Sequence, residues 1–504
     1  MRLKATLLLI FLLSFLFALT AEDSQRLLLA VGPNANPPMA DDLISHSKPT
    51  VAPSSTSTEE SYFNITWGGS SYDYGRSVVV DSSGDIYVTG DTQSFGAGGR
   101  DAVILKFNST GGIVWQKTWG GSNDDVGYGV VVDSSGYVYV TGYTMSFGQG
   151  LEDVFVLKFN STGDLEWQRT WGGDNWDRGL SITVDSSGNI YATGYTLSYG
   201  YSQDWTTRYS AVFLLKLNST GGLEWQRTWE ETYVAQGGSC IATDSSGNIY
   251  VAGYYGDFLL KFNSTGNLLL QRTWGTTSFG SGDQCFGLAL DSSGNIYITG
   301  QTSSFGAGGR DAFILKLSPA GGLVWQKTWG GTGNDEGRGV VVNTSGQIYV
   351  SGLTNSFGAG DYDVFALKLN STDADACLEW QRTIGGVGDD EVFGVAFDTF
   401  GNPVVAGYVS EAPPYNINSS NFILGTPTFN LVTSSFPLDL PTADMGIPSG
   451  TVSTPLGSTA YGGNTDAIFF IIPEFQSSLI IPLFMMATLL TVAICKRRRH
   501  DVRP

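Results

Sequence analysis

The chain has 504 residues, of which 47 are acidic and 27 are basic, so its formal net charge is −20. This charge argues against a nucleic-acid ligand, whose phosphates would be repelled. Four cysteines are too few for a disulfide framework, and the two histidines, His46 and His500, lie near the chain ends, which leaves the central region without an imidazole for catalysis or for a metal.

The first 61 residues predict a leader and a spacer. A basic start precedes an apolar run from Ala5 to Leu19 and a small-residue exit at Ala18 to Ala21, which is the pattern of a secretory signal peptide over residues 1–21. An uncleaved N-terminal membrane helix is the alternative. Residues 22–61 are rich in Pro, Ser, Thr and Asp and show no periodicity, so we expect a disordered spacer there.

Residues 62–472 contain seven copies of one pattern. An Asp-Ser-Ser-Gly turn, altered in the last two copies, recurs every 47 to 59 residues, and most copies end in a Trp-Gln-Lys/Arg-Thr-Trp run. A period of about fifty residues is typical of propellers and repeat arrays. The turns begin at Asp81, Asp133, Asp185, Asp244, Asp291, Asn343 and Asp398.

Each copy predicts four short strands, because its apolar runs alternate or are continuous and are bounded by Gly, Asn, Asp or Ser. In the second copy the strands are Gly129 to Asp133, Tyr137 to Thr141, Val154 to Phe159 and Leu165 to Trp171. Four antiparallel strands cannot bury both faces alone, whereas seven such sheets in a ring leave only short, protected edges. We therefore predict an all-β fold, a seven-bladed β-propeller.

The two ends of the repeat region predict how the ring closes. Tyr62 to Trp67 matches a fourth strand, but no first three strands precede it. The last copy supplies a first, a second and, after a long insertion at residues 410–459, a third strand, but no fourth. The N-terminal strand should therefore complete the last sheet, one strand plus three, and Tyr62 to Trp67 should pair with Ala467 to Ile472.

One stretch of the repeats resembles a known family. Residues 294–331, GNIYITGQTSSFGAGGRDAFILKLSPAGGLVWQKTWGG, are similar to the SBBP family of β-propeller repeats of secreted prokaryotic proteins. The spacing from Thr110-Gly111 to Trp115 also resembles the tryptophan-docking turn of quinone-dependent dehydrogenase propellers, in which a Trp packs between blades. The resemblance implies the propeller fold and an extracellular setting, and it implies no single activity.

The C-terminal residues predict a membrane anchor. After a linker at residues 473–478, Leu479 to Cys495 is largely apolar and long enough to span a bilayer, and the basic tail at residues 496–504 should stay inside. The Pro473-Glu474-Phe475 triplet resembles PEF-type sorting signals of archaeal surface proteins, which imply cleavage as the alternative to a retained helix. In both cases we expect the propeller on the extracellular face of the membrane, and with a retained helix the protein is single-pass with its C-terminus inside.

Eight Asn-x-Ser/Thr sequons predict N-glycosylation of an exported chain. Several of them form the same Asn-Ser-Thr-Gly turn between third and fourth strands, so good turn chemistry is the alternative explanation. The sequons are at Asn64, Asn108, Asn160, Asn218, Asn263, Asn343, Asn370 and Asn418.

An Asp recurs eight residues before the turn in six of the seven copies, and Gln236 replaces it in the other. These carboxylates would surround the mouth of the axial channel on the outward loop face and bind cations or sugar hydroxyls. Calcium is the metal that we keep open, and no other cofactor is predicted. The alternative is that each Asp caps backbone N–H groups of its own loop. The candidates are Asp73, Asp125, Asp177, Asp283, Asp335 and Asp390; a second recurring acid, at Asp101, Asp153, Asp311, Asp363 and Asp466, should close a loop.

Two further features depart from the repeat. The loop at residues 198–210 carries Tyr199, Tyr201 and Trp205, which could stack on a glycan or a protein partner, or could pack on the loop itself. Cys240 and Cys285 fall in first strands of adjacent copies, where either a disulfide or two buried thiols would fit.

No catalytic constellation is visible, and no glycine-rich phosphate loop opens a helix. We therefore predict a surface-anchored binding or adhesion module rather than an enzyme, with a glycan, a protein or a cation as ligand. A glycosidase or polysaccharide lyase that needs only carboxylates, and a purely structural envelope component, are the alternatives.

Overall fold

The computed structural model describes residues 64–200, 210–229, 237–254, 257–274, 283–358, 361–371, 375–386, 388–398, 402–409, 416–418, 438–439, 451–453 and 466–471. All of them belong to one compact unit, residues 60–504, and a second unit covers residues 1–59. The predicted signal peptide, spacer, linker, transmembrane helix and basic tail lie outside the described residues. Within the described ranges, no helix has the length and apolar character needed to cross a bilayer.

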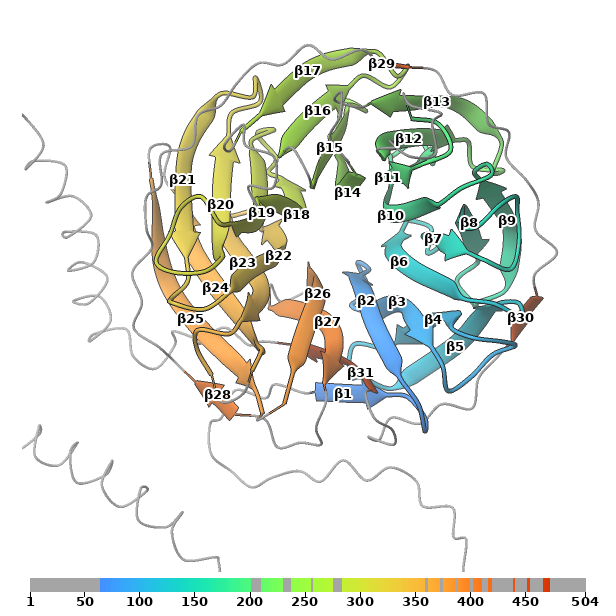
Figure 1. Cartoon of the computed structure of the whole chain (residues 1–504), viewed down its shortest axis with the longest axis horizontal. Coiled ribbons are helices and arrows are strands. Elements are labelled where there is room, and N and C mark those ends of the chain that lie inside the picture. The colour runs from blue at the N-terminus through green and yellow to red at the C-terminus, as the bar shows by residue number, and fades with distance from the viewer. Residues whose placement is uncertain are drawn as a thin grey trace, which may run out of the picture. The chain divides into compact units, whose positions relative to one another are not determined.

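The described part is an all-β β-propeller built from four-stranded antiparallel units (Figure 1). The first strands of the units are β2 (Asp73–Val80), β6 (Asp125–Val132), β10 (Asp177–Val184), β14 (Gly237–Thr243), β18 (Gln284–Leu290), β22 (Asp335–Val342) and β26 (Asp390–Phe397). The second strands are β3 (Ile86–Thr92), β7 (Val138–Thr144), β11 (Ile190–Thr196), β15 (Ile249–Tyr254), β19 (Ile296–Thr302), β23 (Gln347–Thr354) and β27 (Pro403–Val409).

The outer half of each unit consists of a third and a fourth strand. The third strands are β4 (Asp101–Phe107), β8 (Asp153–Phe159), β12 (Ala211–Leu217), β16 (Phe258–Phe262), β20 (Asp311–Leu317), β24 (Asp363–Ser371) and β31 (Asp466–Ile471). The fourth strands are β5 (Ile113–Gly120), β9 (Leu165–Trp171), β13 (Leu223–Trp229), β17 (Leu268–Thr273), β21 (Leu323–Trp329), β25 (Ala376–Gly385) and β1 (Asn64–Trp67).

The predicted count of seven separate blades is wrong, because the hydrogen bonds define six sheets. One sheet has eight strands, since β15 of one unit also pairs with β18 of the next at Tyr254 and Gln284. The link consists of this single residue pair. It forms where the second strand of one unit and the first strand of the next come close enough for their backbones to bond, which a sequence pattern does not reveal.

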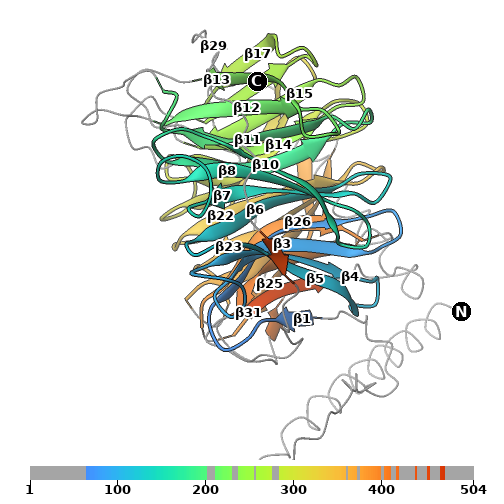
Figure 2. The ribbon, with the colours of Figure 1, turned by 90° about the vertical axis from the view of Figure 1, so that its right-hand side faces the viewer.

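The first strands lie closest to the axis, and each contacts the next around the ring (Figure 1). The contacts run from β2 through β6, β10, β14, β18, β22 and β26 back to β2. Figure 2 shows the same sheets from the side, stacked face against face. The hydrophobic core lies between neighbouring sheets, as in the cluster that joins Ala102 and Ile104 to Val138 and Val140. Stacking in a ring therefore buries the apolar faces that a single unit would expose.

The predicted closure is confirmed. In the last sheet the strand order is β1, β31, β27, β26, so the N-terminal strand is the outer strand of the C-terminal sheet. Ile65 pairs with Phe469 and Trp67 with Ala467. The last sheet thus combines one strand from the start of the repeat region with three from its end, and it leaves no open seam in the ring.

Tryptophans join neighbouring units, as the docking resemblance implied. The second Trp of the Trp-Gln-Lys/Arg-Thr-Trp run donates its indole N–H to a Gln on the fourth strand of the next unit: Trp119 to Gln168 at 2.7 Å and Trp171 to Gln226 at 2.7 Å. The first Trp of the run bonds the next unit's Asn-Ser-Thr-Gly turn, as Trp115 does at Ser161 O. One short run therefore provides two contacts to the neighbouring sheet.

The predicted insertion contributes three short strands to the outer edges of other sheets. β28 (Asn416–Asn418) pairs with β25, β29 (Leu438–Asp439) with β13, and β30 (Thr451–Ser453) with β5. The chain then enters the closing sheet as β31. In chain order these pairings lie on the sixth, the third and the first unit of the ring. These segments therefore cover strand edges, which would otherwise be open to pairing with other chains.

Candidate functional site

Each first strand contains a β-bulge at the same position, five residues before the turn. In the second unit, Gly127 pairs with Gly142 and Gly129 with Thr141, so Tyr128 has no partner in the ladder. The other first strands show the same slip of one residue. A bulge turns the side chain of its extra residue away from the regular alternation. The bulged residues are Arg76, Tyr128, Leu180, Ser239, Phe286, Arg338 and Phe393.

The bulge explains the glycine of the recurring Thr-Gly or Ala-Gly pair in the second strand. A Cβ on Gly142 would overlap the carbonyl oxygen of Val126 and would lie 2.7 Å from the Phe155 ring. Gly90 and Gly194 meet the carbonyl oxygens of Tyr74 and Arg178 in the same way. The bulge brings one backbone against the other, and only a residue without a side chain fits opposite it.

The bulged residues surround a cavity on the propeller axis. Its volume is about 180 Å³, and its wall consists of the bulged residues and the one or two residues that follow each of them. Many of these followers are small, such as Ser77, Gly129 and Ser181, so the side chains of the bulged residues dominate the wall. A volume of this size would hold about six water molecules at about 30 Å³ each, or one small ligand.

Arg76 and Arg338 lie on either side of Phe393. The guanidinium carbon of Arg76 is 5.6 Å from the centroid of the Phe393 ring, and that of Arg338 is 5.9 Å from it. Arg76 also lies 5.0 Å from the Tyr128 ring, and Arg338 lies 4.4 Å from the Phe286 ring. This part of the wall therefore alternates planar cations with aromatic faces, which attract each other.

Carboxylates outside the ring of bulged residues form ion pairs with the guanidinium groups of Arg76 and Arg338. Arg76 Nε donates to Asp91 Oδ1 at 2.5 Å, and Arg338 Nη2 lies 2.6 Å from Glu336 Oε2. Burial opposes the charged form of Arg76, but Asp91, Tyr128 and Tyr143 together outweigh it and the pKa of Arg76 is raised. Arg338 Nε is buried and has no hydrogen-bond partner among the described residues. The ring therefore contains one buried donor that the described side chains do not satisfy.

A second cluster lies beside the ring in the second and third units. Arg178 forms an ion pair with the buried Glu152 and lies 4.4 Å from the centroid of the Tyr143 ring. Burial, followed by the nearby Tyr128, raises the pKa of Tyr143 to about 12, so its hydroxyl stays protonated. Hydroxyl and guanidinium donors thus gather on this side of the axis.

The six predicted binding carboxylates lie at or next to the start of the first strands, and all are buried. Asp125 Oδ2 accepts from Gly121 N at 2.7 Å and from Ser146 Oγ at 2.7 Å. Equivalent bonds to a backbone N–H or to a serine are formed by Asp73, Asp177, Asp283, Asp335 and Asp390. The structure places these side chains inside their own loops, which is the capping alternative, and does not place them on the wall of the axial cavity. Gln236 lies outside the described residues.

The second recurring acid closes the loop before the third strand, as predicted. Asp101 Oδ2 accepts from Ala97 N at 3.0 Å, and Asp311 Oδ2 from Ala307 N at 3.0 Å. Each also faces a first-strand Asp of the next unit, which gives acid pairs such as Asp153 with Asp177. Burial, and then Asp177, raises the pKa of Asp153 to about 8; burial raises the pKa of Asp101 and Asp311 to about 6.

These raised pKa values predict that Asp101, Asp153 and Asp311 contribute more stability at acid pH than at neutral pH. Because Asp153 binds its proton more tightly in the folded state than in the unfolded chain, its contribution is complete below about pH 4 and is lost as the pH rises to about 8. In urea unfolding at several pH values, Asp153→Asn should flatten this slope by up to about 1.4 kcal/mol per pH unit. The exposed Asp174→Asn is the matched control and should leave the slope unchanged. Equal slopes for Asp153→Asn and the wild type would contradict the assignment.

Of the three aromatic candidates in the loop at residues 198–210, Tyr199 is the one that lies within the described residues. Tyr199 packs on Trp171 with ring centroids 5.2 Å apart, and its hydroxyl donates to Gly172 O at 2.7 Å. Phe147 takes the same position against Trp119. Tyr199 therefore has the packing role that the sequence left open for it. Tyr201 and Trp205 lie outside the described residues.

Most of the sequon asparagines accept hydrogen bonds within their own turns. Asn108 Oδ1 accepts from Thr110 N at 3.0 Å, Thr110 Oγ1 at 2.8 Å and Gly112 N at 2.8 Å. Asn160, Asn218 and Asn263 repeat this network, and Asn343 forms a similar one. Asn370 ends its strand with an exposed side chain, and for Asn64 and Asn418 only the backbone is described. Turn chemistry thus accounts for the recurrence, and glycosylation stays a prediction.

Cys240 and Cys285 are both buried free thiols, which decides between the two alternatives left by the sequence. Burial raises the pKa of Cys240 to about 12, so the thiol is not a reactive nucleophile. In the described part of the chain, no group of three or more Asp, Glu, Cys or His side chains is arranged to hold a metal ion.

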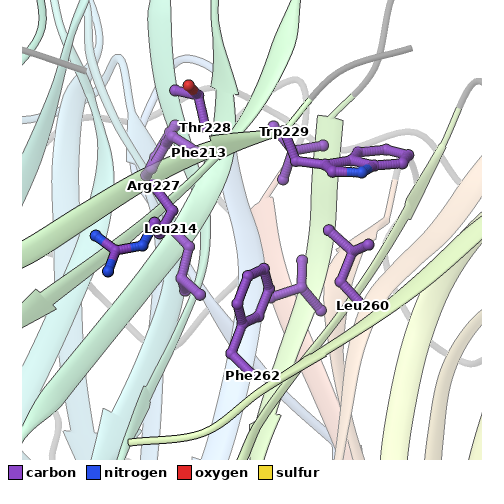
Figure 3. A pocket seen from close by; sticks show the side chains of 9 residues that line it. Phe213, Leu214, Arg227, Thr228, Trp229, Leu260 and Phe262 are labelled. Carbon is purple, nitrogen blue, oxygen red and sulfur yellow. The ribbon is translucent and has the colours of Figure 1, made fainter. Parts of the chain in front are cut away.

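A second gap, shown in Figure 3, lies between two neighbouring units and not on the axis. Leu214 and Trp229 of one unit face Leu260 and Phe262 of the next. The gap is apolar and too small for a water molecule, so it is part of the core between sheets. The axial cavity is therefore the better candidate site.

Sequence reasoning missed the ring of bulged residues. The signal was present, because the position five before the turn holds Arg, Tyr, Leu, Ser or Phe inside a pattern that is otherwise nearly constant. A position that varies within an otherwise constant repeat is not constrained by the packing of the sheet. The alternating pattern alone could not show that this residue faces the axis.

The comparisons with known proteins agree with the fold. The model of the SBBP β-propeller repeat matches residues 66–96, 118–146, 177–202 and 278–306. An uncharacterized WD repeat-containing protein, L264, of Acanthamoeba polyphaga mimivirus is 28% identical over 27% of this chain, and the regulatory protein FlaEY of Caulobacter vibrioides is 25% identical over 24% of it. The matches span only 10% and 15% of the length of these two relatives.

Solved structures that are similar to this chain include those of a lyase and of a trans-sialidase. A streptogramin B lyase structure is 14% identical, with a TM-score of 0.43 over 68% of this chain and 94% of the other. The intramolecular trans-sialidase from Ruminococcus gnavus is 8% identical, with a TM-score of 0.37 over 67% of this chain and 90% of the other. Likenesses at this level say nothing about activity. The SBBP β-propeller repeat therefore occurs at four places in this chain, within the ring of antiparallel sheets.

Proposed function

We propose that the protein is a binding module of the cell surface and that its ligand, a carbohydrate, enters the axial cavity. The ring of bulged side chains carries this proposal. Aromatic faces such as Tyr128 and Phe393, next to guanidinium donors, are the groups that bind the apolar face and the hydroxyls of a sugar. The cavity volume of about 180 Å³ suits a single sugar unit or the end of a chain.

The same proposal includes a count of the repeating units. Although the hydrogen bonds define six sheets, we propose that the eight-stranded sheet acts as two blades, because a single pair, Tyr254 with Gln284, joins its halves. Each of the seven sequence copies then supplies one bulged residue to the axis. The supporting observation is that β14 and β18 each have their own bulge and lie next to each other in the ring.

The surface location rests on the predicted signal peptide and C-terminal helix, which lie outside the described residues. The basic tail at residues 496–504 supports an inside C-terminus. The short linker at residues 473–478 supports a propeller held close to the membrane, with the Asp-Ser-Ser-Gly and Asn-Ser-Thr-Gly turns on the side that faces the membrane. Protease treatment of intact cells should digest the propeller and should leave an epitope tag on the C-terminus protected. A protected propeller would contradict this location.

A glycan array with the purified full-length chain tests the binding proposal. We expect saturable binding, and we expect Tyr128→Ala to weaken it at least tenfold, because the variant removes an aromatic face from the cavity. The matched control is Tyr72→Ala, since Tyr72 is 40% exposed and does not line the cavity. Equal weakening of glycan binding by both variants would rule out the axial site. An array without any bound glycan would favour a structural role for the protein.

A carboxylate-dependent hydrolase or lyase is the second candidate function. Burial raises the pKa of Glu391, although Tyr408 and Arg338 oppose the shift, and a carboxyl group with a raised pKa is a candidate general acid. Reducing-sugar or unsaturated products, released by the wild type and lost in Glu391→Gln, would support this function. Bound glycans that stay intact would exclude it.

A further inference from the structure

We propose that the sugar held in the axial cavity carries a carboxylate, as a uronic acid does, and that Arg76 and Arg338 bind this group. This inference rests on the proposed function and specifies its ligand class. The protein as a whole is strongly acidic, with a net charge of −20. Nevertheless, the ring of bulged residues contains two arginines and no acid, so both charged side chains on the described wall of the axial cavity are basic.

The carboxylates behind the ring are shared between cations. Asp91 accepts from Arg76 and also lies 3.8 Å from Arg100 Nη1, whose second acid is Asp124. Glu336 lies near both Arg338 and Arg310, at 2.6 and 3.4 Å. Within the described residues, neither Arg76 nor Arg338 therefore forms an ion pair with a carboxylate that it does not share with a second arginine.

Both guanidinium groups keep donors for a ligand. A guanidinium has five N–H groups, and within the described residues Arg76 uses only its Nε for a hydrogen bond. Arg338 Nε is buried without a partner, a position that costs free energy unless a ligand or a water accepts from it. The planar fork of N–H groups matches the two oxygens of a carboxylate.

The aromatic side chains favour a sugar acid over a small inorganic anion. Phe393 lies between the two arginines, and Phe286 lies beside Arg338. An inorganic anion would leave these apolar faces uncovered, whereas a sugar ring would stack on one of them and present its carboxylate to the neighbouring guanidinium. The overall negative charge also disfavours a highly charged polymer such as a nucleic acid.

Calorimetric titration of the full-length protein tests the ligand class with four probes: glucuronate, its methyl ester, glucose and acetate. We expect glucuronate to bind at least tenfold more tightly than its neutral ester or glucose, and acetate to compete only weakly. These comparisons use the wild type, so they do not depend on how well a variant folds. An oligouronide and the free sugar acid should then show whether the site takes chain ends or monosaccharides.

Two variants assign the carboxylate contact. Arg338→Gln and Arg76→Gln should reduce the affinity for glucuronate to that for glucose, with little change for glucose itself. Arg169→Gln is the matched control. Arg169 lies on the outer strand β9, away from the cavity, and its Nε donates to Gly221 O of the next unit. Equal affinities for glucuronate, ester and glucose, all lost in Tyr128→Ala, would overturn the inference but keep the binding function. The absence of binding to any sugar would overturn both.

Discussion

Gly142→Ala is expected to destabilise the propeller by about 3 kcal/mol or more, which is the upper range for overpacking a core. The new methyl group would overlap the carbonyl oxygen of Val126, and neither backbone can move without disturbing the bulge at Tyr128. The free energy of unfolding, measured in urea, checks this expectation. The axial site should suffer too, since the bulge that turns Tyr128 toward the axis would be lost.

Gly322→Ala is the matched control for this variant. Gly322 has an ordinary backbone conformation, and the nearest atom to an added Cβ would be the mobile Ser318 Oγ at 3.3 Å. Its free energy of unfolding should stay within about 0.5 kcal/mol of the wild type. If Gly142→Ala were equally neutral, the close approach of β6 and β7 would not hold in solution and the bulge would lose its physical basis.

Trp119→Ala should lower the free energy of unfolding by about 3 to 5 kcal/mol, the usual cost of deleting a large buried aromatic side chain. Trp119 is fully buried, lies 4.6 Å from the Phe155 ring by centroids, and bonds to Gln168 of the next unit. The variant removes apolar contact between two sheets and leaves the Gln168 side chain without this donor. Urea unfolding followed by tryptophan fluorescence measures the loss.

Trp176→Ala removes the same side chain from a surface position and serves as the control. Trp176 is 48% exposed, so we expect a change of less than about 1 kcal/mol. Similar losses for both variants would mean that the tryptophans stabilise each unit locally and do not join neighbouring sheets. A large difference would confirm that stability depends on contacts between units.

Local features of the repeat could be predicted from the sequence because they recur from copy to copy. Asp133 accepts from Ser135 N and Tyr137 N in its turn, and Gly136 takes a positive φ of 82°, as the Asp-Ser-Ser-Gly pattern predicts. The predicted third and fourth strands of the second copy agree with β8 and β9 to within one residue. The first strand was predicted to begin at Gly129 but begins at Asp125, because the bulge at Tyr128 interrupts the alternation that marks a strand.

The amino-acid sequence by itself determined the all-β fold, the strands of each copy and the closure of the ring by β1, since each depends on short-range turn chemistry, on alternation and on a count of strands. Only the tertiary structure decided which side chains meet at the axis, which carboxylates are buried in their loops, and which edges the insertion covers. A bulge depends on how two strands pair, and an edge contact joins residues far apart in the chain, such as Thr451 and Gly120. No pattern along a single strand records either of them.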